Sequence, residues 1–208
     1  MQIAIPLYPG FTATDAIGPY EVLSRLPGAR TVFVAREAGL VRSDTGFLQV
    51  QAEPLAAAAS AQIVVVPGAP SRNLPLHDAV LLDWLRAVDA NTLWTTSVCT
   101  GALLLGAAGL LRGKRATTHW QDVDALAAHG AIATAGRYVF DGKLVTAAGV
   151  SAGFDMALAL AARIAGDAVA QAIQLGLEYA PLPPFDAGTP DRAPAAIVAM
   201  VRRGTTGA

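Results

Sequence analysis

The segment TTSVCTGALLL (residues 95–105) decides the fold, because in it a β-rich run passes directly into a small, Leu-rich run. The first run indicates a strand and the second a helix. The pattern Ser97-x-Cys99-x-Gly101 has the outline of a nucleophile elbow, a sharp strand-to-helix turn that lifts one reactive side chain above the edge of a sheet. We therefore predict that Cys99, the only cysteine in the chain, stands at such a turn.

The same alternation of strand and helix signals continues on both sides of this segment. The expected strands span residues 3–7, 31–35, 47–52, 63–66, 92–98, 116–118, 132–135, 138–140 and 143–145, the last two as a hairpin with an Asp-Gly turn. The expected helices span residues 18–23, with Pro19 in the first turn, then 78–88, 101–111, 119–128, 152–164, 167–179 and 195–202. The wholly apolar run 63–66 is typical of a parallel strand covered on both faces. The pattern therefore predicts a parallel sheet with helices on both sides.

Composition limits the class of protein. The chain has 208 residues, of which 53% are hydrophobic and 15% charged, which suits one α/β domain with a full core. The net charge of −1 gives no electrostatic reason to expect binding to nucleic acid or to an anionic membrane. One cysteine excludes an internal disulfide framework and a cysteine-based zinc site. Without a signal-peptide pattern or a long apolar span, we expect a soluble, cytoplasmic protein.

Three segments follow strand ends and are candidates for the functional site. They are the loop containing Asp15, the pair Gly68-Ala69, and the pair Cys99-Thr100. In sheets of this kind a ligand binds outside the carboxyl ends of the strands. The three segments come from different strands, so we expect them to converge there.

Two interpretations of Cys99 are open. At a helix N-terminus the macrodipole and free N–H groups lower a thiol pKa and favour a reactive thiolate, and the N–H groups of Thr100 and Gly101 can hold an anion. Alternatively, Cys99 is a small hydrophobic residue buried in the core. Its position at a strand-to-helix turn favours the functional interpretation.

Asp15 also has two interpretations: it caps the first helix, or its carboxyl faces the Cys99 sulfur. A carboxylate beside a thiolate is not stable as two charges, so we expect the pair to share a proton, which raises the pKa of one partner. A protonated Asp15 would serve as a general acid.

The three histidines give little support to a Cys-His pair. His77 is expected to face solvent, and His129 to lie at a helix C-terminus. His119 follows a strand, and we expect it to make a structural or interface hydrogen bond. No phosphate loop, dinucleotide-binding glycine pattern or metal-ligand spacing is recognised in the sequence.

Several motifs together resemble the ThiJ/PfpI superfamily, which is related to class I glutamine amidotransferases. They are YPGFTATDAIGPYEVL (8–23), VVVPG (64–68), SVCTGA (97–102), TTHW (117–120) and VTAAG (145–149). The resemblance extends to about Tyr179. It implies a flavodoxin-like three-layer α/β/α sandwich with a mainly parallel sheet, which we expect as a single domain over residues 1–208.

Two positions narrow the resemblance to the isocyanide hydratase branch. Asp15 stands where many members carry Glu, and Thr100 where protease-like members carry His. The branch implies a cofactor-free homodimer that acts on a small, apolar electrophile. In it Cys99 is the nucleophile, Asp15 its acid/base partner, and Gly68 supplies a backbone N–H while Thr100 sets the environment of the thiol. Ala69 and Gly101 are expected as further backbone donors, and no metal is expected. The reaction would add water to an isocyanide through a thioimidate and release an N-substituted formamide.

Two alternatives stay open. The motifs also resemble the sensor half of AraC-type regulators, although the 29 residues after Tyr179 are too few for a helix-turn-helix domain. The third interpretation is a Cys-dependent stress-response or glyoxalase-like protein that acts on oxidised or glycated targets, with Cys99 as a redox sensor.

Overall fold

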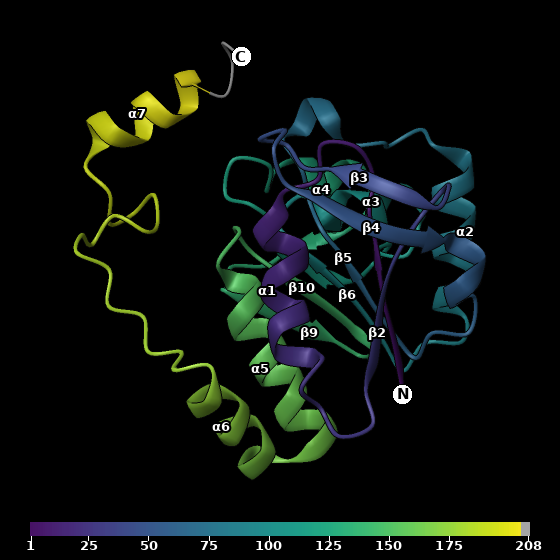
Figure 1. Ribbon diagram of the computed structural model, residues 1–208. Coiled ribbons are helices and arrows are strands. Elements are labelled where there is room, and N and C mark those ends of the chain that lie inside the picture. Colours follow the sequence, from purple (N-terminus) through teal and green to yellow (C-terminus); the bar gives the residue numbers. More distant parts are fainter. Residues whose placement is uncertain (205–208) are drawn as a thin grey trace. The chain divides into compact units, whose positions relative to one another are not determined.

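The structure is a computed structural model that describes residues 1–204, and the chain divides into two compact units (Figure 1). The first unit, Met1–Leu177, contains both sheets and every element from β1 to α6. The second unit begins at Glu178 and contains α7 (Ala195–Gly204). The expected single domain over residues 1–208 stays a prediction.

The first unit is built on an eight-stranded sheet. Its strands lie in the order β3-β4-β2-β1-β5-β6-β10-β9, and a separate two-stranded sheet joins β7 to β8. The inner strands are parallel, whereas β3 and β9 run antiparallel at the two edges. The bounds are β1 Gln2–Pro6, β2 Arg30–Ala35, β3 Gly39–Arg42, β4 Gln49–Pro54, β5 Ile63–Val66, β6 Trp94–Val98, β7 Arg115–Ala116, β8 Ile132–Ala133, β9 Tyr138–Asp141 and β10 Leu144–Ala147. The predicted mainly parallel sheet is confirmed.

Helices form the outer layers (Figure 1). Helix α1 (Ala13–Leu23) packs on α5 (Ala152–Ala165), which continues into α6 (Asp167–Gly176). On the opposite side of the sheet, α2 (Ala79–Asp89) packs on α3 (Gly101–Ala107), which contacts the short α4 (Ala125–Ala128). Two 3₁₀ turns, η1 (Leu55–Ala58) and η2 (Ser71–Asn73), complete the unit. The predicted three-layer α/β/α sandwich is confirmed. Every residue of β5 is buried, as its apolar run predicts.

Helix α1 differs from its predicted bounds. It begins at Ala13 and carries Pro19 in its interior, whereas a start near Gly18 was expected. A proline ring in a helix interior normally costs about 3 kcal/mol. Tertiary packing overrides that preference here: a Cβ built on Gly153 of α5 would lie only 3.2 Å from Pro19 Cδ, so α1 and α5 are in close contact.

Three other helices are shorter than expected, among them α6, which ends at Gly176 and not at Tyr179, and one strand was missed. Only the last part of the predicted helix 119–128 forms, as α4. In the segment before it, side chains accept hydrogen bonds that compete with a helix: Asp122 accepts from Ser71 Oγ, and His119 Nδ1 accepts from the Gln121 N–H. Helix α3 ends at Ala107, and Gly109 then adopts a positive φ of 82°. The short edge strand β3 carries no clear apolar alternation and was not predicted.

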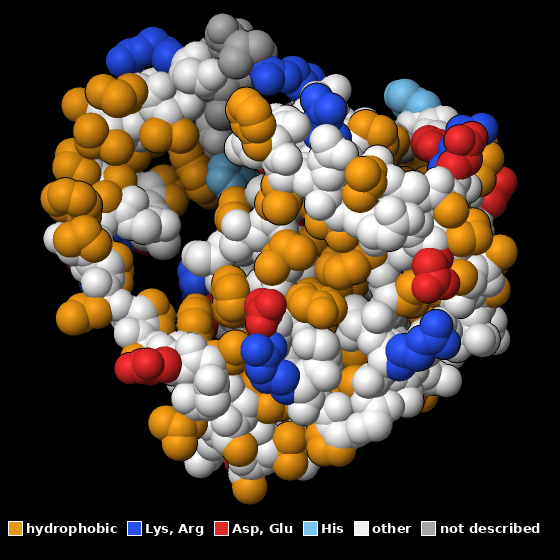
Figure 2. Space-filling view, viewed as in Figure 1, with side chains coloured by type: hydrophobic (Ala, Val, Ile, Leu, Met, Phe, Trp, Pro, Cys, Tyr) orange, Lys and Arg blue, Asp and Glu red, His pale blue; other side chains and the backbone are white. Residues whose placement is uncertain are grey.

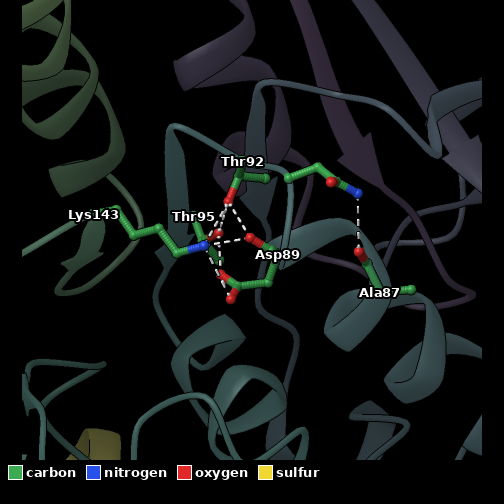
Figure 3. A network of polar contacts seen from close by, with 6 residues as sticks. Ala87, Asp89, Thr92, Thr95 and Lys143 are labelled. Atoms are coloured by element: carbon green, nitrogen blue, oxygen red, sulfur yellow. Dashed lines mark hydrogen bonds and ion pairs between the residues drawn. The ribbon is translucent and has the colours of Figure 1, made fainter.

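A polar network fastens α2 to the start of β6 and to the β9–β10 turn (Figure 3). The Thr95 hydroxyl donates to Asp89 Oδ1 at 2.6 Å and lies 2.7 Å from the Thr92 hydroxyl. The Lys143 ammonium lies 3.1 Å from Asp89 Oδ2 and also donates to the Asp89 carbonyl oxygen. The network lies at the amino ends of the strands, so it braces the sheet at the edge away from Cys99.

Surface charge is dispersed on the face seen in Figure 2, where Lys, Arg, Asp and Glu side chains stand singly or in small groups. In the second unit, large apolar side chains at Leu182, Phe185 and Met200 are exposed, and α7 has no buried residue. No helix within residues 1–204 is long and apolar enough to cross a membrane.

Candidate active site

Three neighbouring parallel strands, β1, β5 and β6, deliver the candidate site residues to one edge of the sheet. The loop after β1 leads to Asp15, β5 ends just before Gly68, and β6 ends just before Cys99. The Gly68 N–H donates to Asp15 Oδ2 at 3.0 Å, and the Ala69 N–H donates to the Thr100 hydroxyl at 2.9 Å. The predicted convergence of the three segments is confirmed.

Cys99 occupies a strained turn between β6 and α3. Its φ is +56°, a value that non-glycine residues rarely adopt and that costs about 1–3 kcal/mol. Hydrogen bonds hold it there. Its N–H is shared between the carbonyl oxygens of Ala147 and Ala148, at 3.1 and 2.9 Å, and the Thr118 hydroxyl donates to its carbonyl oxygen at 2.8 Å. This is the geometry expected of a nucleophile elbow.

Gly101 is required by the tight packing of this turn. A Cβ built on it would lie 2.2 Å from the carbonyl oxygen of Val66 and 2.9 Å from the carbonyl carbon of Pro67. Backbone atoms cannot move aside as a flexible side chain can. The loop after β5 therefore lies directly against the turn that carries Cys99.

Thr100 is bound to the same loop. Its hydroxyl accepts from the Ala69 N–H and donates to the Ala69 carbonyl oxygen at 2.6 Å, and the residue is buried. The N–H groups of Gly68 and Ala69 are thus engaged with Asp15 and Thr100, and in this structure they position those side chains. Contact of Gly68, Ala69 or Gly101 with a substrate stays a prediction.

Asp15 is fully buried and does not cap α1. The N-cap residue is Thr12, and the Asp15 carboxyl turns instead to Gly68. Oδ1 has no hydrogen-bond partner among the described residues. Burial raises the Asp15 pKa from 3.8 to about 7 and outweighs the Gly68 N–H and the Cys99 side chain, which lower this pKa. The charge of Asp44 raises the pKa further, and His119 lowers it.

The environment of Cys99 bears on which partner of the expected pair holds the shared proton. Cys99 is only 6% exposed, and burial, followed by the charge of Asp15, raises the pKa of its thiol far above the usual value. The Thr100 N–H and hydroxyl lower it by less. Desolvation of the sulfur outweighs the few donors at the start of the seven-residue helix α3. These effects favour a neutral Cys99 thiol beside a carboxyl whose pKa is raised to about 7.

His119 lies in the loop before α4 and pairs with Asp122. Its Nδ1 lies 3.7 Å from Asp122 Oδ2, while Asp122 Oδ1 accepts from Ser71 at 2.8 Å. The His119 side chain has the largest of the effects that lower the Asp122 pKa. A Cβ on Gly149 would lie 3.1 Å from His119 Cδ2, so the ring also packs beside the end of β10.

Sequence reasoning missed three contributors to the site: Thr118, Asp122 and Tyr8. Thr118 holds the Cys99 carbonyl, Asp122 raises the Cys99 pKa, and the Tyr8 hydroxyl donates to the Pro67 carbonyl at 2.8 Å. Thr118 and Tyr8 lie inside motifs quoted above, but their partners are distant in sequence, and no local pattern identifies such contacts. Within residues 1–204 no cluster of three or more His, Cys, Asp or Glu side chains is arranged to hold a metal ion.

Comparison with known proteins gives three informative matches. The model of the DJ-1/PfpI family matches residues 1–163. An isonitrile hydratase of Pseudomonas putida is 43% identical over 203 residues, which cover 98% of this chain and 89% of that protein. The crystal structure of a ThiJ/PfpI family protein from Pseudomonas syringae superposes with a TM-score of 0.92 at 39% identity, covering 99% of this chain and 87% of that one.

A more distant relative has a different role. The HTH-type transcriptional regulator CdhR of Pseudomonas aeruginosa is 37% identical over 92 residues, which cover 43% of this chain and 27% of the regulator. The match to the hydratase therefore extends over far more of the chain than the match to the regulator.

Proposed function

The chain belongs to the DJ-1/PfpI family, and from this premise we propose that it is an isonitrile hydratase, which adds water to an isonitrile and releases an N-substituted formamide. One observation carries the proposal: the only cysteine stands at a strained turn beside a buried carboxyl whose pKa is raised to about 7. The 43% identity to the Pseudomonas putida isonitrile hydratase over nearly the whole chain supports the same reaction.

The first chemical step forms a covalent thioimidate. The terminal carbon of an isonitrile accepts both a nucleophile and a proton. As the Cys99 sulfur bonds to that carbon, Asp15 takes the thiol proton and transfers it to the same carbon, giving R–N=CH–S–Cys99. The unpartnered Asp15 Oδ1 is suited to carry this proton. No thiolate has to accumulate, which agrees with the raised Cys99 pKa.

The second step consumes water. The ionised Asp15 accepts a proton from water as the oxygen adds to the thioimidate carbon, and passes that proton to the imine nitrogen. The C–S bond of the adduct R–NH–CH(OH)–S–Cys99 then breaks, the O–H proton of the adduct is carried by Asp15 to the sulfur, and the formamide R–NH–CHO leaves. Asp15 acts as acid and as base in one cycle, and a pKa of about 7 suits both roles near neutral pH.

Turnover tests the proposal directly. Purified protein is incubated with an alkyl isonitrile, and formamide is measured by NMR for the wild type and three variants. Cys99→Ala should abolish product, and Asp15→Asn should lower kcat by about 10²–10⁴-fold. Asp83→Asn, which changes an exposed carboxyl, should retain wild-type turnover. No formamide from the wild type would refute the function, and product from Cys99→Ala would refute the mechanism.

A homodimer in the cytoplasm completes the proposal. The exposed apolar side chains at Leu182, Phe185 and Met200 are consistent with an apolar contact between copies. A cytoplasmic location agrees with the use of a single reduced cysteine. Sedimentation of the full chain and fractionation of cells test these two statements.

The second candidate function is a ligand-binding sensor module, which the match to part of CdhR favours. It predicts that isonitriles bind without turnover. A glyoxalase-like protein instead predicts consumption of methylglyoxal that depends on Cys99. Measuring isonitrile binding, isonitrile turnover and methylglyoxal consumption for the same set of variants separates the three functions.

A further inference from the structure

Tyr8 is a buried titratable residue that the proposed reaction does not use. It follows β1, is 6% exposed, and its hydroxyl donates to the carbonyl oxygen of Pro67 at 2.8 Å. Burial raises its pKa well above the usual value, and the charges of Asp15 and Cys99 raise it further. The phenol is therefore a neutral hydrogen-bond donor near neutral pH.

The Pro67 carbonyl and the Gly68 N–H belong to one planar peptide unit. The Tyr8 hydroxyl donates to the oxygen of this peptide unit, and the N–H of the same unit donates to Asp15 Oδ2 at 3.0 Å. Hydrogen bonds therefore hold the unit from both sides. The carbonyl of Gly68 is fixed separately, because it accepts from the Thr12 N–H at 2.8 Å. A continuous hydrogen-bonded path thus runs from the phenol through one peptide to the carboxyl.

Two physical effects make this path matter for the carboxyl. A donor at a peptide oxygen polarises the amide, so its N–H becomes a stronger donor to the group that it faces. The same donor opposes rotation of the peptide plane. Rotation would turn the Pro67 carbonyl toward Asp15, in place of the N–H that stabilises the ionised carboxylate. Both effects favour ionised Asp15.

We propose that Tyr8 is a positioning residue, which acts through the Pro67–Gly68 peptide to set the proton affinity of Asp15. The inference deepens the proposed function and rests on it for its catalytic meaning. The other groups that act on the Asp15 carboxyl are Cys99 after β6, Asp44 after β3 and His119 after β7. None of them contacts the Pro67–Gly68 peptide through a hydrogen bond in the described structure, so Tyr8 can be varied separately from them.

The test is a direct titration of Asp15 that needs no turnover. Protein labelled with ¹³C at the Asp Cγ is titrated by NMR, and the Asp15 signal is assigned with Asp15→Asn. Tyr8→Phe removes only the hydroxyl and should raise the Asp15 midpoint by roughly 0.5 pH unit. The acid limb of the kcat profile, on which Asp15 loses the ionised form that takes the thiol proton, should move up by the same amount. Tyr20→Phe, which removes a hydroxyl from a tyrosine packed on Phe33, should leave the midpoint unchanged.

A second variant keeps the inference testable if Tyr8→Phe does not fold. Replacing Tyr8 with 3-fluorotyrosine keeps the ring and makes the phenol a stronger donor, so the Asp15 midpoint should fall. An unchanged midpoint in either folded variant, or a shift of the opposite sign, would overturn the role of Tyr8. If wild-type protein turns over no isonitrile while both shifts occur, the function fails and the role of Tyr8 stands.

Discussion

A carboxyl that must ionise inside a protein lowers its stability, and Asp15 is such a carboxyl. Its pKa is about 7 in the folded chain against 3.8 for the usual group, because burial outweighs the hydrogen bond from Gly68. Between these two values the folded state holds a proton that the unfolded state has released. The contribution of Asp15 to stability is therefore fully present below pH 4 and is lost as the pH rises through 7.

Asp15→Asn removes this ionisation and should flatten the pH dependence. We expect the difference in the free energy of unfolding, variant minus wild type, to be larger at pH 8 than at pH 4 by up to about 4 kcal/mol. Urea unfolding of both proteins at several pH values measures the difference, and Asp83→Asn serves as the control. A difference that does not change with pH would mean that Asp15 ionises normally. Together with the loss of turnover, this stabilisation would mark Asp15 as a residue kept for chemistry at a cost in stability.

At the scale of elements, the polar network in Figure 3 joins α2, β6 and the β9–β10 turn. Thr95 is fully buried and donates to Asp89, whose charge is compensated by Lys143. Asp89 is half-buried, so water only partly replaces a hydrogen bond that its carboxylate loses. The sheet therefore depends on this hydroxyl as well as on its apolar core.

Thr95→Val should lower the free energy of unfolding by about 1–3 kcal/mol. The chain offers a matched control at Thr31 in β2, whose buried hydroxyl has no hydrogen-bond partner among the described residues. Thr31→Val removes an unsatisfied polar group, so it should be neutral or stabilising. Denaturant unfolding of the two variants measures the contrast. Equal effects at both positions would show that the network does not stabilise the sheet.

For the whole molecule, the two units differ in how they are held together. The hydrophobic core comprises residues of the first unit, from Ile3 to Ile173, whereas α7 has no buried residue. The site segments after β1, β5 and β6 all lie in the first unit as well. The hydrophobic core and the candidate site therefore both lie within residues 1–177.

A chain ending at Leu177 should fold by itself. We expect its thermal midpoint to lie within about 4 °C of that of the full chain, since a shift of this size corresponds to roughly 1 kcal/mol. Sedimentation of the full chain in parallel should give twice the mass of one copy. If the truncated protein remains unfolded, the first unit needs the residues after Leu177 in order to fold. A monomeric full chain would contradict the proposed homodimer.

The amino-acid sequence by itself determined the features that depend on neighbouring residues. The apolar run of β5, the Asp-Gly hairpin turn and the strand-to-helix break at Cys99 follow from local pattern, and they were enough to predict a parallel sheet with three loops at one edge. Because parallel strands in such a sheet end at the same edge, even the meeting of Asp15, Gly68 and Cys99 could be predicted.

Only the tertiary structure decided the protonation of the site and the partners of its side chains. A helix N-terminus lowers the pKa of a thiol, but burial of the sulfur and the nearby Asp15 charge raise the pKa of Cys99 instead. The interior Pro19 is likewise tolerated because α5 packs closely against it. The Tyr8 hydrogen bond joins residues 59 positions apart. Solvation, packing and long-range contacts depend on the complete fold, and no local window of sequence contains them.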